Sequence, residues 1–294
     1  MPVKLRVILS VTAFVILLFG SGLARASSLA FDSAADPAYN GGWGNGSNGG
    51  YGWGSGWQFF GPGGFIIGTS TTNGVGDPGW DGDIDTDGRS WGELTSVDPH
   101  SDSVADATRA FSGALSIGQS FTINMDNGIE YGGSPLAASS SVRLGNQFGT
   151  AFTLAVQINT NFSTYYVIGD ATGSHVLPLA LTDQGLHIVF ALTSSKNYEF
   201  SVSGAGTDAP SGLPYVFSGI LDDSLGTNIT SVSLVSENSG TNPANWNFFN
   251  DMAIVPEPSA LRLVGLALPL ALLLRRNKSL NETVRGPCKV STMV

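Results

Sequence analysis

The sequence predicts an all-β fold, an antiparallel β-sandwich or jelly roll, from three observations. Short runs in which apolar residues alternate with polar ones recur from Ser120 onward. Turn residues separate these runs at intervals of roughly ten residues, and no amphipathic helix pattern lies between them. Strands without crossover helices pair antiparallel, so two facing sheets would bury their apolar sides.

The predicted strands cover residues 121–125, 142–144, 152–158, 165–168, 186–192, 198–202, 215–220, 232–234 and 246–254. In the runs 121–125, 152–158, 186–192 and 232–234 apolar residues recur at every second position, as a strand with one face on a core requires. The sequence Asp126-Asn127-Gly128, directly after the first run, predicts a turn.

Residues 36–92 combine a composition rich in Gly, Asn and Ser with many large rings. Five of the six tryptophans lie here, at positions 43, 53, 57, 80 and 91. A flexible linker does not need so many apolar rings, so we expect short strands and tight turns whose aromatics reach the core. The alternative is an exposed aromatic platform for sugars, built from Trp43, Tyr51, Trp53 and Trp57.

The N-terminus has the pattern of a secretory signal peptide. Two basic residues precede an apolar run at 7–19, which is shorter than the ~20 residues needed to cross a bilayer. Ala24 and Ala26 then give the small-x-small pattern of a signal-peptidase site before Ser27. We therefore expect residues 1–26 to be removed on export.

The remaining body, residues 27–255, is strongly acidic. It holds four Lys and Arg residues against 21 of the 23 Asp and Glu residues, a formal charge of −17. Such a surface repels phosphate backbones and anionic lipids, which argues against nucleic-acid binding and peripheral membrane docking. The single cysteine, Cys288, lies outside the body, which excludes disulfides and thiol chemistry within it.

The C-terminal tail has three parts in order, and these are Pro256-Glu257-Pro258, an apolar stretch over residues 263–274, and the basic pair Arg275 and Arg276. The prolines end the last strand and present an extended segment. We expect the apolar stretch to form a short hydrophobic helix, inserted transiently in the inner membrane with the basic pair on the cytoplasmic side.

This order of motif, apolar segment and basic pair resembles the sorting tail of the PEP-CTERM family of exported bacterial proteins. The resemblance implies that an exosortase-type enzyme cuts near the motif. It also implies a location at the cell surface, in the outer envelope or in an extracellular matrix rich in polysaccharide. Residues 256–278 would be the sorting segment, and residues 279–294 a polar tail with no assigned role.

The body is also similar to sandwich domains found with such tails. The similar stretches are residues 83–92, 107–111 and 118–128. The resemblance implies a jelly-roll or concanavalin-like architecture for the body, and it implies no particular activity.

An acidic loop is the best candidate for a metal site. Alternating carboxylates place hard oxygens on one side of a short loop, as calcium prefers, and Gly88 permits a sharp turn. The candidate ligands are Asp81, Asp83, Asp85, Asp87 and Glu93. Counted from Asp83, the twelfth position of an EF-hand is Leu94 rather than Glu, so a calcium loop of another kind is expected. The alternative is a solvated acidic turn.

No nucleophile elbow or phosphate loop is present in the sequence, and we assign no catalytic residues. The first hypothesis is a non-catalytic structural or adhesive protein of the cell surface, associated with polysaccharide. The alternatives are a secreted glycan-active enzyme, which needs a groove with paired carboxylates, and a calcium-dependent lectin-like module.

Calcium binding at the acidic loop predicts a rise in Tm with calcium concentration, because a ligand that binds only the folded state stabilises it. A thermal-shift titration of the protein against the Asp83→Ala plus Asp85→Ala double variant measures this. An unchanged Tm at millimolar calcium, or the same rise in the double variant, would contradict the calcium site.

Overall fold

The computed structural model describes residues 28–73, 84–95, 103–128, 139–147, 149–158, 164–179, 182, 184–205, 213–221, 228–240 and 243–256. The predicted signal peptide and the tail from Glu257 onward, with its hydrophobic helix, lie outside these residues and stay predictions. Within the described ranges, no helix has the length and hydrophobicity needed to cross a membrane.

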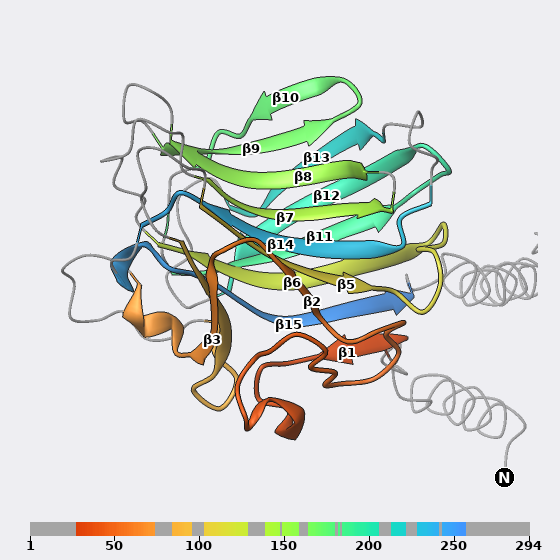
Figure 1. The fold of residues 1–294 in the computed structure, drawn as a ribbon. Coiled ribbons are helices and arrows are strands. Elements are labelled where there is room, and N and C mark those ends of the chain that lie inside the picture. The colour runs from red at the N-terminus through yellow and green to blue at the C-terminus, as the bar shows by residue number, and fades with distance from the viewer. Residues whose placement is uncertain are drawn as a thin grey trace, which may run out of the picture. The chain divides into compact units, whose positions relative to one another are not determined.

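The described strands form two antiparallel sheets that face each other (Figure 1). Sheet I contains, in spatial order, β13 (Tyr215–Ile220), β12 (Asn197–Gly204), β11 (Leu186–Leu192), β6 (Gln119–Asn127), β15 (Asn247–Pro256), β4 (Ser90–Leu94) and β3 (Gly64–Gly68), with β1 (Ala30–Asp32) also paired to β15. Sheet II contains β10 (Gly173–Val176), β9 (Thr164–Asp170), β8 (Gly149–Ile158), β7 (Ser139–Asn146), β14 (Ser231–Glu237), β5 (Val104–Ala110) and β2 (Gln58–Phe60). Short 3-10 helices η1 (Pro37–Tyr39), η2 (Ser70–Thr72) and η4 (Pro243–Asn245) lie in the connections.

The expected all-β sandwich is confirmed, and each predicted run overlaps a strand. The predicted turn at 126–128 is wrong, because β6 continues through Asn127. Asp126 and Asn127 pair with Phe248 and Asn247 of β15 and therefore belong to the ladder. Asn127 also accepts a hydrogen bond from the Tyr166 hydroxyl of sheet II at 2.9 Å, so this position is fixed from both sides.

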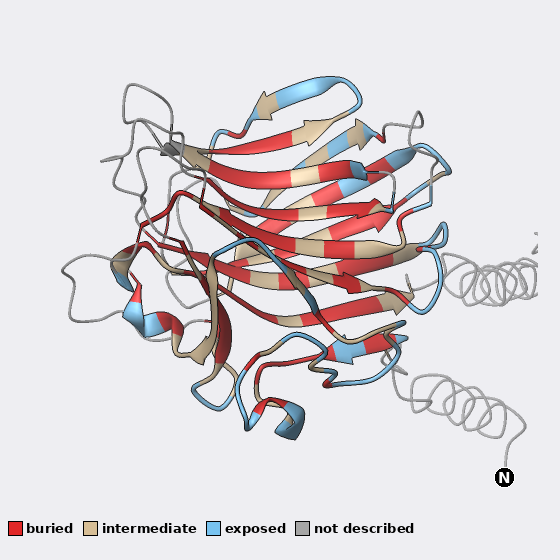
Figure 2. Ribbon diagram, viewed as in Figure 1, coloured by how far each residue is buried: buried red, intermediate tan, exposed pale blue. Residues whose placement is uncertain are grey.

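The hydrophobic core lies between the two sheets, on the inward half of each alternating strand (Figure 2). Phe152 of sheet II shows how the sheets meet. Its ring centroid lies 4.9 Å from that of Phe190 and 5.1 Å from that of Tyr198, both on sheet I. Tilted and edge-on ring contacts of this kind add to the stabilisation from burial itself.

The glycine- and tryptophan-rich segment belongs to the core. Trp57 and Trp91 are 0% exposed and Trp43 is 4% exposed. Their rings pack edge-on, with centroids 5.2 Å apart for Trp43 and Trp57 and 5.5 Å apart for Trp57 and Trp91. The alternative of a sugar-binding platform is therefore wrong for Trp43 and Trp57, since buried rings cannot stack on a ligand. Tyr51 stays exposed and Trp53 is half-buried.

A buried ion pair joins the two sheets beneath this segment. Arg109 of β5 in sheet II contacts Asp32 of β1 in sheet I, and both side chains are fully buried. The remaining donors of Arg109 reach the segment: Nη2 donates to Asn48 Oδ1 at 2.7 Å and to the Gly49 carbonyl at 2.8 Å, and Nε donates to the Ser55 carbonyl at 3.2 Å. The planar five-donor guanidinium suits this fork of acceptors, which a lysine could not match.

Aromatic groups enclose the ion pair. The guanidinium carbon of Arg109 lies 5.0 Å from the Trp53 ring centroid and 5.5 Å from that of Trp57. The Tyr39 hydroxyl donates to Asp32 and accepts from Trp57 Nε1 at 3.0 Å. Burial raises the pKa of Asp32 to about 6, against the lowering effects of Arg109 and Tyr39. At neutral pH the carboxylate is therefore mostly ionised and pairs with the guanidinium.

Two glycines let the segment run against β1. Gly50 has φ +66°, and a Cβ there would lie 2.0 Å from the Phe31 carbonyl oxygen. Gly52 has φ +80°, and a Cβ there would lie 2.1 Å from the Leu29 carbonyl oxygen. Neither position can take another residue without moving the backbone.

Replacing Arg109 with methionine would leave Asp32 buried without its cation, which costs about 3–5 kcal/mol of unfolding free energy. Chemical denaturation of the Arg109→Met variant measures this loss. Arg143→Met is the matched control, because Arg143 pairs with Glu237 at a partly exposed site where an ion pair contributes about 1 kcal/mol or less. Equal effects of the two substitutions would show that the buried pair does not hold the segment in place.

Candidate functional site

The outer face of sheet II is polar because its strands alternate. On β14, Val232 and Leu234 point into the core, whereas Ser231 and Ser233 point outward. On β7, Arg143 points outward between two buried residues. The strand pairing places Ser233 directly beside Arg143, so hydroxyl and guanidinium groups share one surface.

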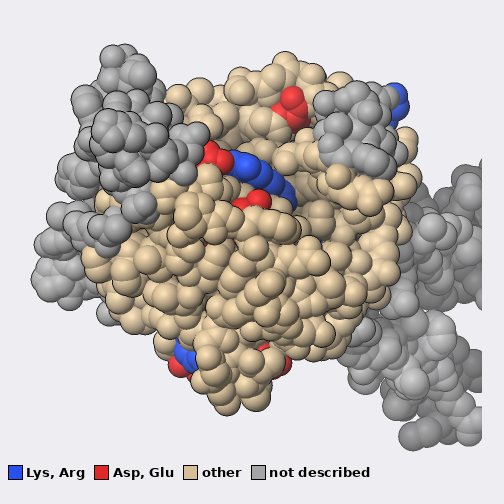
Figure 3. Space-filling model, viewed as in Figure 1, with Lys and Arg blue, Asp and Glu red and all other residues tan. Residues whose placement is uncertain are grey.

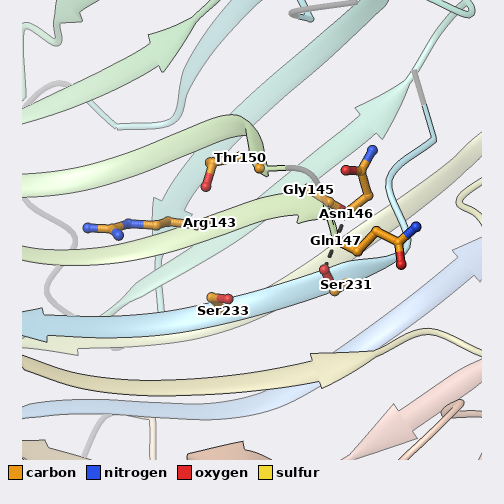
Figure 4. Close-up of a pocket in the computed structure, with 8 residues that line it drawn as sticks. Arg143, Gly145, Asn146, Gln147, Thr150, Ser231 and Ser233 are labelled. Carbon is orange, nitrogen blue, oxygen red and sulfur yellow. Dashed lines mark hydrogen bonds between the residues drawn. The ribbon is translucent and has the colours of Figure 1, made fainter. Parts of the chain in front are cut away.

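A hollow lies in this face, and its polar lining consists of Arg143, Asn146, Gln147, Thr150, Ser231 and Ser233 (Figure 4). Two of its lining residues are joined by a hydrogen bond, which Ser231 Oγ donates to the Gly145 carbonyl at 3.3 Å. The register of β7 and β8 shifts between Leu144 and Gly145. Such bulges re-aim side chains and are common beside binding sites.

Charges of both signs meet in the same face. Figure 3 shows a basic side chain in a hollow, with acidic groups beside it. Arg143 Nη2 lies 2.7 Å from Glu237 Oε1, and its Nε donates to Ser141 Oγ at 3.0 Å. Ser139 Oγ donates to the other Glu237 oxygen at 3.1 Å. Both charged side chains are about one-third exposed, so the ion pair contributes little to the stability of the fold. Its main effect is to hold the Arg143 and Glu237 side chains in one orientation on this face.

Asp106 of β5 is a second carboxyl on this face and is half-buried. Thr108 Oγ1 donates to Asp106 Oδ1 at 2.9 Å and lies 2.6 Å from Ser233 Oγ. Burial raises the pKa of Asp106, and the charge of Glu237 adds to this, while the Thr108 hydrogen bond and Arg143 act in the opposite direction. The face therefore holds two carboxyls in different environments, linked by one guanidinium and a row of hydroxyls.

The predicted calcium ligands are only partly placed. Asp81 and Asp83 lie outside the described residues. Asp85 accepts from Thr69 Oγ1 at 2.5 Å and from the Ser70 amide at 3.0 Å. Asp87 is exposed, with φ +52°.

Glu93, the fifth predicted ligand, is 0% exposed and lies inside the sandwich on β4. Among the residues whose positions are described, no three His, Cys, Asp or Glu side chains gather as a metal site would require. The calcium loop stays a prediction. The same holds for the processing residues Ala24, Ala26, Ser27, Glu257, Pro258, Arg275 and Arg276, while Pro256 is the last residue of β15.

Sequence reasoning missed the residues of this hollow. Their signal was present in the polar half of the alternation, with Ser231 and Ser233 interleaved between apolar residues and Arg143 between valine and leucine. What the sequence does not contain is the pairing of β7 with β14 and β5 with β14, which brings these residues together.

No protein-family model matches this chain, and no curated protein matches it in sequence. Solved structures with a related arrangement include the globular domain of T. cruzi calreticulin, with 12% identity, a TM-score of 0.41, and coverage of 76% of this chain and 95% of that one. The endo-β-1,4-glucuronan lyase of the fungus Trichoderma reesei has 8% identity, a TM-score of 0.39, and coverage of 66% and 87%. The legume lectin-like domain from Entamoeba histolytica has 7% identity, a TM-score of 0.38, and coverage of 67% and 88%. Likenesses at this level do not indicate what this chain binds.

Proposed function

We propose that this protein is exported and acts without catalysis at the cell surface or in the extracellular matrix, where the outer face of sheet II binds polysaccharide. In this proposal, signal peptidase removes residues 1–26 and an exosortase-type enzyme processes the tail at Pro256-Glu257-Pro258. The body that remains is the functional part.

The hollow on sheet II carries the proposal. Its lining offers amide groups from Asn146 and Gln147 and hydroxyls from Thr150, Ser231 and Ser233. These groups donate and accept hydrogen bonds, as sugar hydroxyls do, and several come from paired strands that hold them rigidly.

The charge of the site favours an uncharged glycan. Among the described residues that line the hollow, Arg143 is the one cation, and its Nη2 is already engaged by Glu237. Asp106 lies on the same face, and the body carries a formal charge of −17. A polyanionic chain would be repelled at long range and would find its one cation neutralised.

Glycan binding through this face predicts that the Ser231→Val plus Ser233→Val variant loses affinity for a neutral polysaccharide by about tenfold or more, because two hydrogen-bonding groups are removed. A glycan array followed by titration of the best ligand measures this. Ser218→Val is the control, since Ser218 is exposed on β13 of the other sheet. Absence of binding to every glycan, or equal affinity in both variants, would contradict the proposal.

A glycan-active enzyme is the second candidate, and one observation favours it. Asp106 pairs with Val235 and Glu237 pairs with Val104, so the two carboxyls are diagonal neighbours on adjacent strands. Diagonal neighbours lie roughly 7–8 Å apart at Cα. Side chains on one face at this backbone spacing can bring two carboxyls to the separation of about 5–10 Å that glycosidases use. The raised pKa of Asp106 fits a general acid.

The two candidates differ in one measurement, the release of reducing ends from a bound glycan. Non-catalytic binding predicts no release by the protein at any pH. A measurable rate that falls by about 100-fold or more in Asp106→Asn, but not in the exposed-site control Asp87→Asn, would replace the binding proposal with an enzyme.

A further inference from the structure

Phe60 is an exposed aromatic residue on the same face of sheet II as the hollow. It lies on β2, the strand at one edge of the sheet, and it is 53% exposed. Phe59, the residue before it, packs against the core and stacks on Phe65 with ring centroids 3.9 Å apart. Because side chains alternate along a strand, Gln58 and Phe60 both point outward. Packing of the core therefore does not explain the ring at position 60.

The chain that follows Phe60 leaves space beside the ring. Residues 61–64 are three glycines and a proline, so no bulky side chain comes directly after it. Gly61 has φ +83°, and a Cβ there would lie 2.2 Å from the Val104 carbonyl oxygen. Glycine is therefore needed where the chain leaves β2 close to β5. One consequence is that the ring of Phe60 stays open to a ligand.

A continuous polar surface joins Phe60 to the hollow. In the strand pairing Phe60 lies opposite Asp106 of β5, and Gln58 lies opposite Thr108. Thr108 Oγ1 lies 2.6 Å from the Oγ of Ser233 on β14, which lines the hollow. The surface therefore crosses the adjacent strands β2, β5, β14 and β7. Neighbouring strands lie about 4.8 Å apart, so the span from β2 to β7 is about 14 Å.

The groups along this surface suit a neutral sugar chain. The amide of Gln58 and the hydroxyl of Thr108 can donate and accept hydrogen bonds, and the carboxyl of Asp106 can accept them, as sugar hydroxyls require. The ring of Phe60 offers an apolar face of the size of a pyranose ring. The described residues of β2 and β5 include one cation, Arg109, and it is buried on the opposite side of β5. A polyanionic chain would therefore meet a carboxyl here without a compensating cation.

We propose that the hollow is one end of an extended glycan site and that Phe60 forms the other end by stacking on a pyranose ring. The inference rests on the proposed function and adds the class of ligand to it. That ligand is a stretch of neutral polysaccharide whose pyranose units expose an apolar C–H face. The chain lies across the strands of sheet II, from the hollow to the edge at β2. A monosaccharide is shorter than the span of about 14 Å, so full affinity requires a chain of several units.

The dependence of affinity on chain length tests this inference. The polysaccharide that binds best on a glycan array is cut into oligosaccharides of increasing length, and each is titrated by calorimetry. We expect Phe60→Ala to weaken binding of the long oligosaccharides by about three- to tenfold, because the stacking contact is lost. The shortest oligosaccharide that binds should keep its affinity, because it does not reach from the hollow to the ring. Phe60→Trp should bind the long chains at least as tightly as the wild type, because its ring is larger.

Val216→Ala is the matched control. Val216 is 56% exposed and lies on β13, the edge strand of the other sheet, so its truncation removes a similarly exposed apolar side chain away from the site. Its affinity should equal that of the wild type at every chain length. Urea unfolding of both alanine variants checks that neither substitution changes the fold, as expected for exposed positions.

The outcomes separate this inference from the proposed function. Wild-type protein that binds no glycan would contradict both. If glycans bind and Ser231→Val plus Ser233→Val weakens them, but Phe60→Ala matches the wild type at every chain length, the proposed function stands and the extended site is overturned. An equal loss in Phe60→Ala for the shortest and the longest chains would also overturn it, since the ring would then act on the hollow rather than on a distant part of the chain.

Discussion

The ion pair between Asp32 and Arg109 is the contact through which the two sheets and the glycine-rich segment become one structure. Asp32 enters from β1 at the side of sheet I, and Arg109 from β5 of sheet II. Every remaining donor of the guanidinium is directed at main-chain or amide oxygens of residues 48–55 or at the Tyr39 hydroxyl. Buried pairs of this kind contribute less to net stability than their Coulomb energy suggests, because both charges lose their hydration. In this protein the ion pair holds residues 48–55 in one backbone conformation, although their glycine-rich composition would allow many.

The strands were largely predictable because burial on one face imposes a period of two on the sequence. The strands that were missed show where this signal fails. β5 has Ala105, Ala107 and Arg109 on its buried side, so its inward pattern is small or charged rather than apolar. β1 and β2 have three residues each, too short for any period to be read. The role of Arg109 depends on Asp32, 77 residues away, and no local pattern encodes that distance.

The candidate site was hidden for a related reason. The search for strands relies on the apolar residues that face the core, whereas the hollow is lined by the polar residues on the opposite face of the same strands. Glu93 has surroundings that its spacing alone does not suggest. It became a candidate ligand of the acidic loop because it lies one residue before the twelfth position counted from Asp83, whereas the alternation of β4 turns its side chain into the core. Spacing along the chain predicts which side chains are neighbours only where the backbone keeps one conformation. Between Asp87 and Glu93 the backbone changes from a turn to the strand β4.

The pairing of β1 with β15 has a consequence for the connectivity of the chain. Ala30 lies opposite Ile254, and the Leu29 amide donates to the Ile254 carbonyl at 2.7 Å, so the first and last strands of the body end side by side. A short linker from residue 256 to residue 28 could join them without crossing either sheet. The body should therefore accept circular permutation, with new termini opened in a surface connection and every strand pairing retained. Folding of such a permuted body would show that the strand pairings determine the fold and that the position of the chain ends does not.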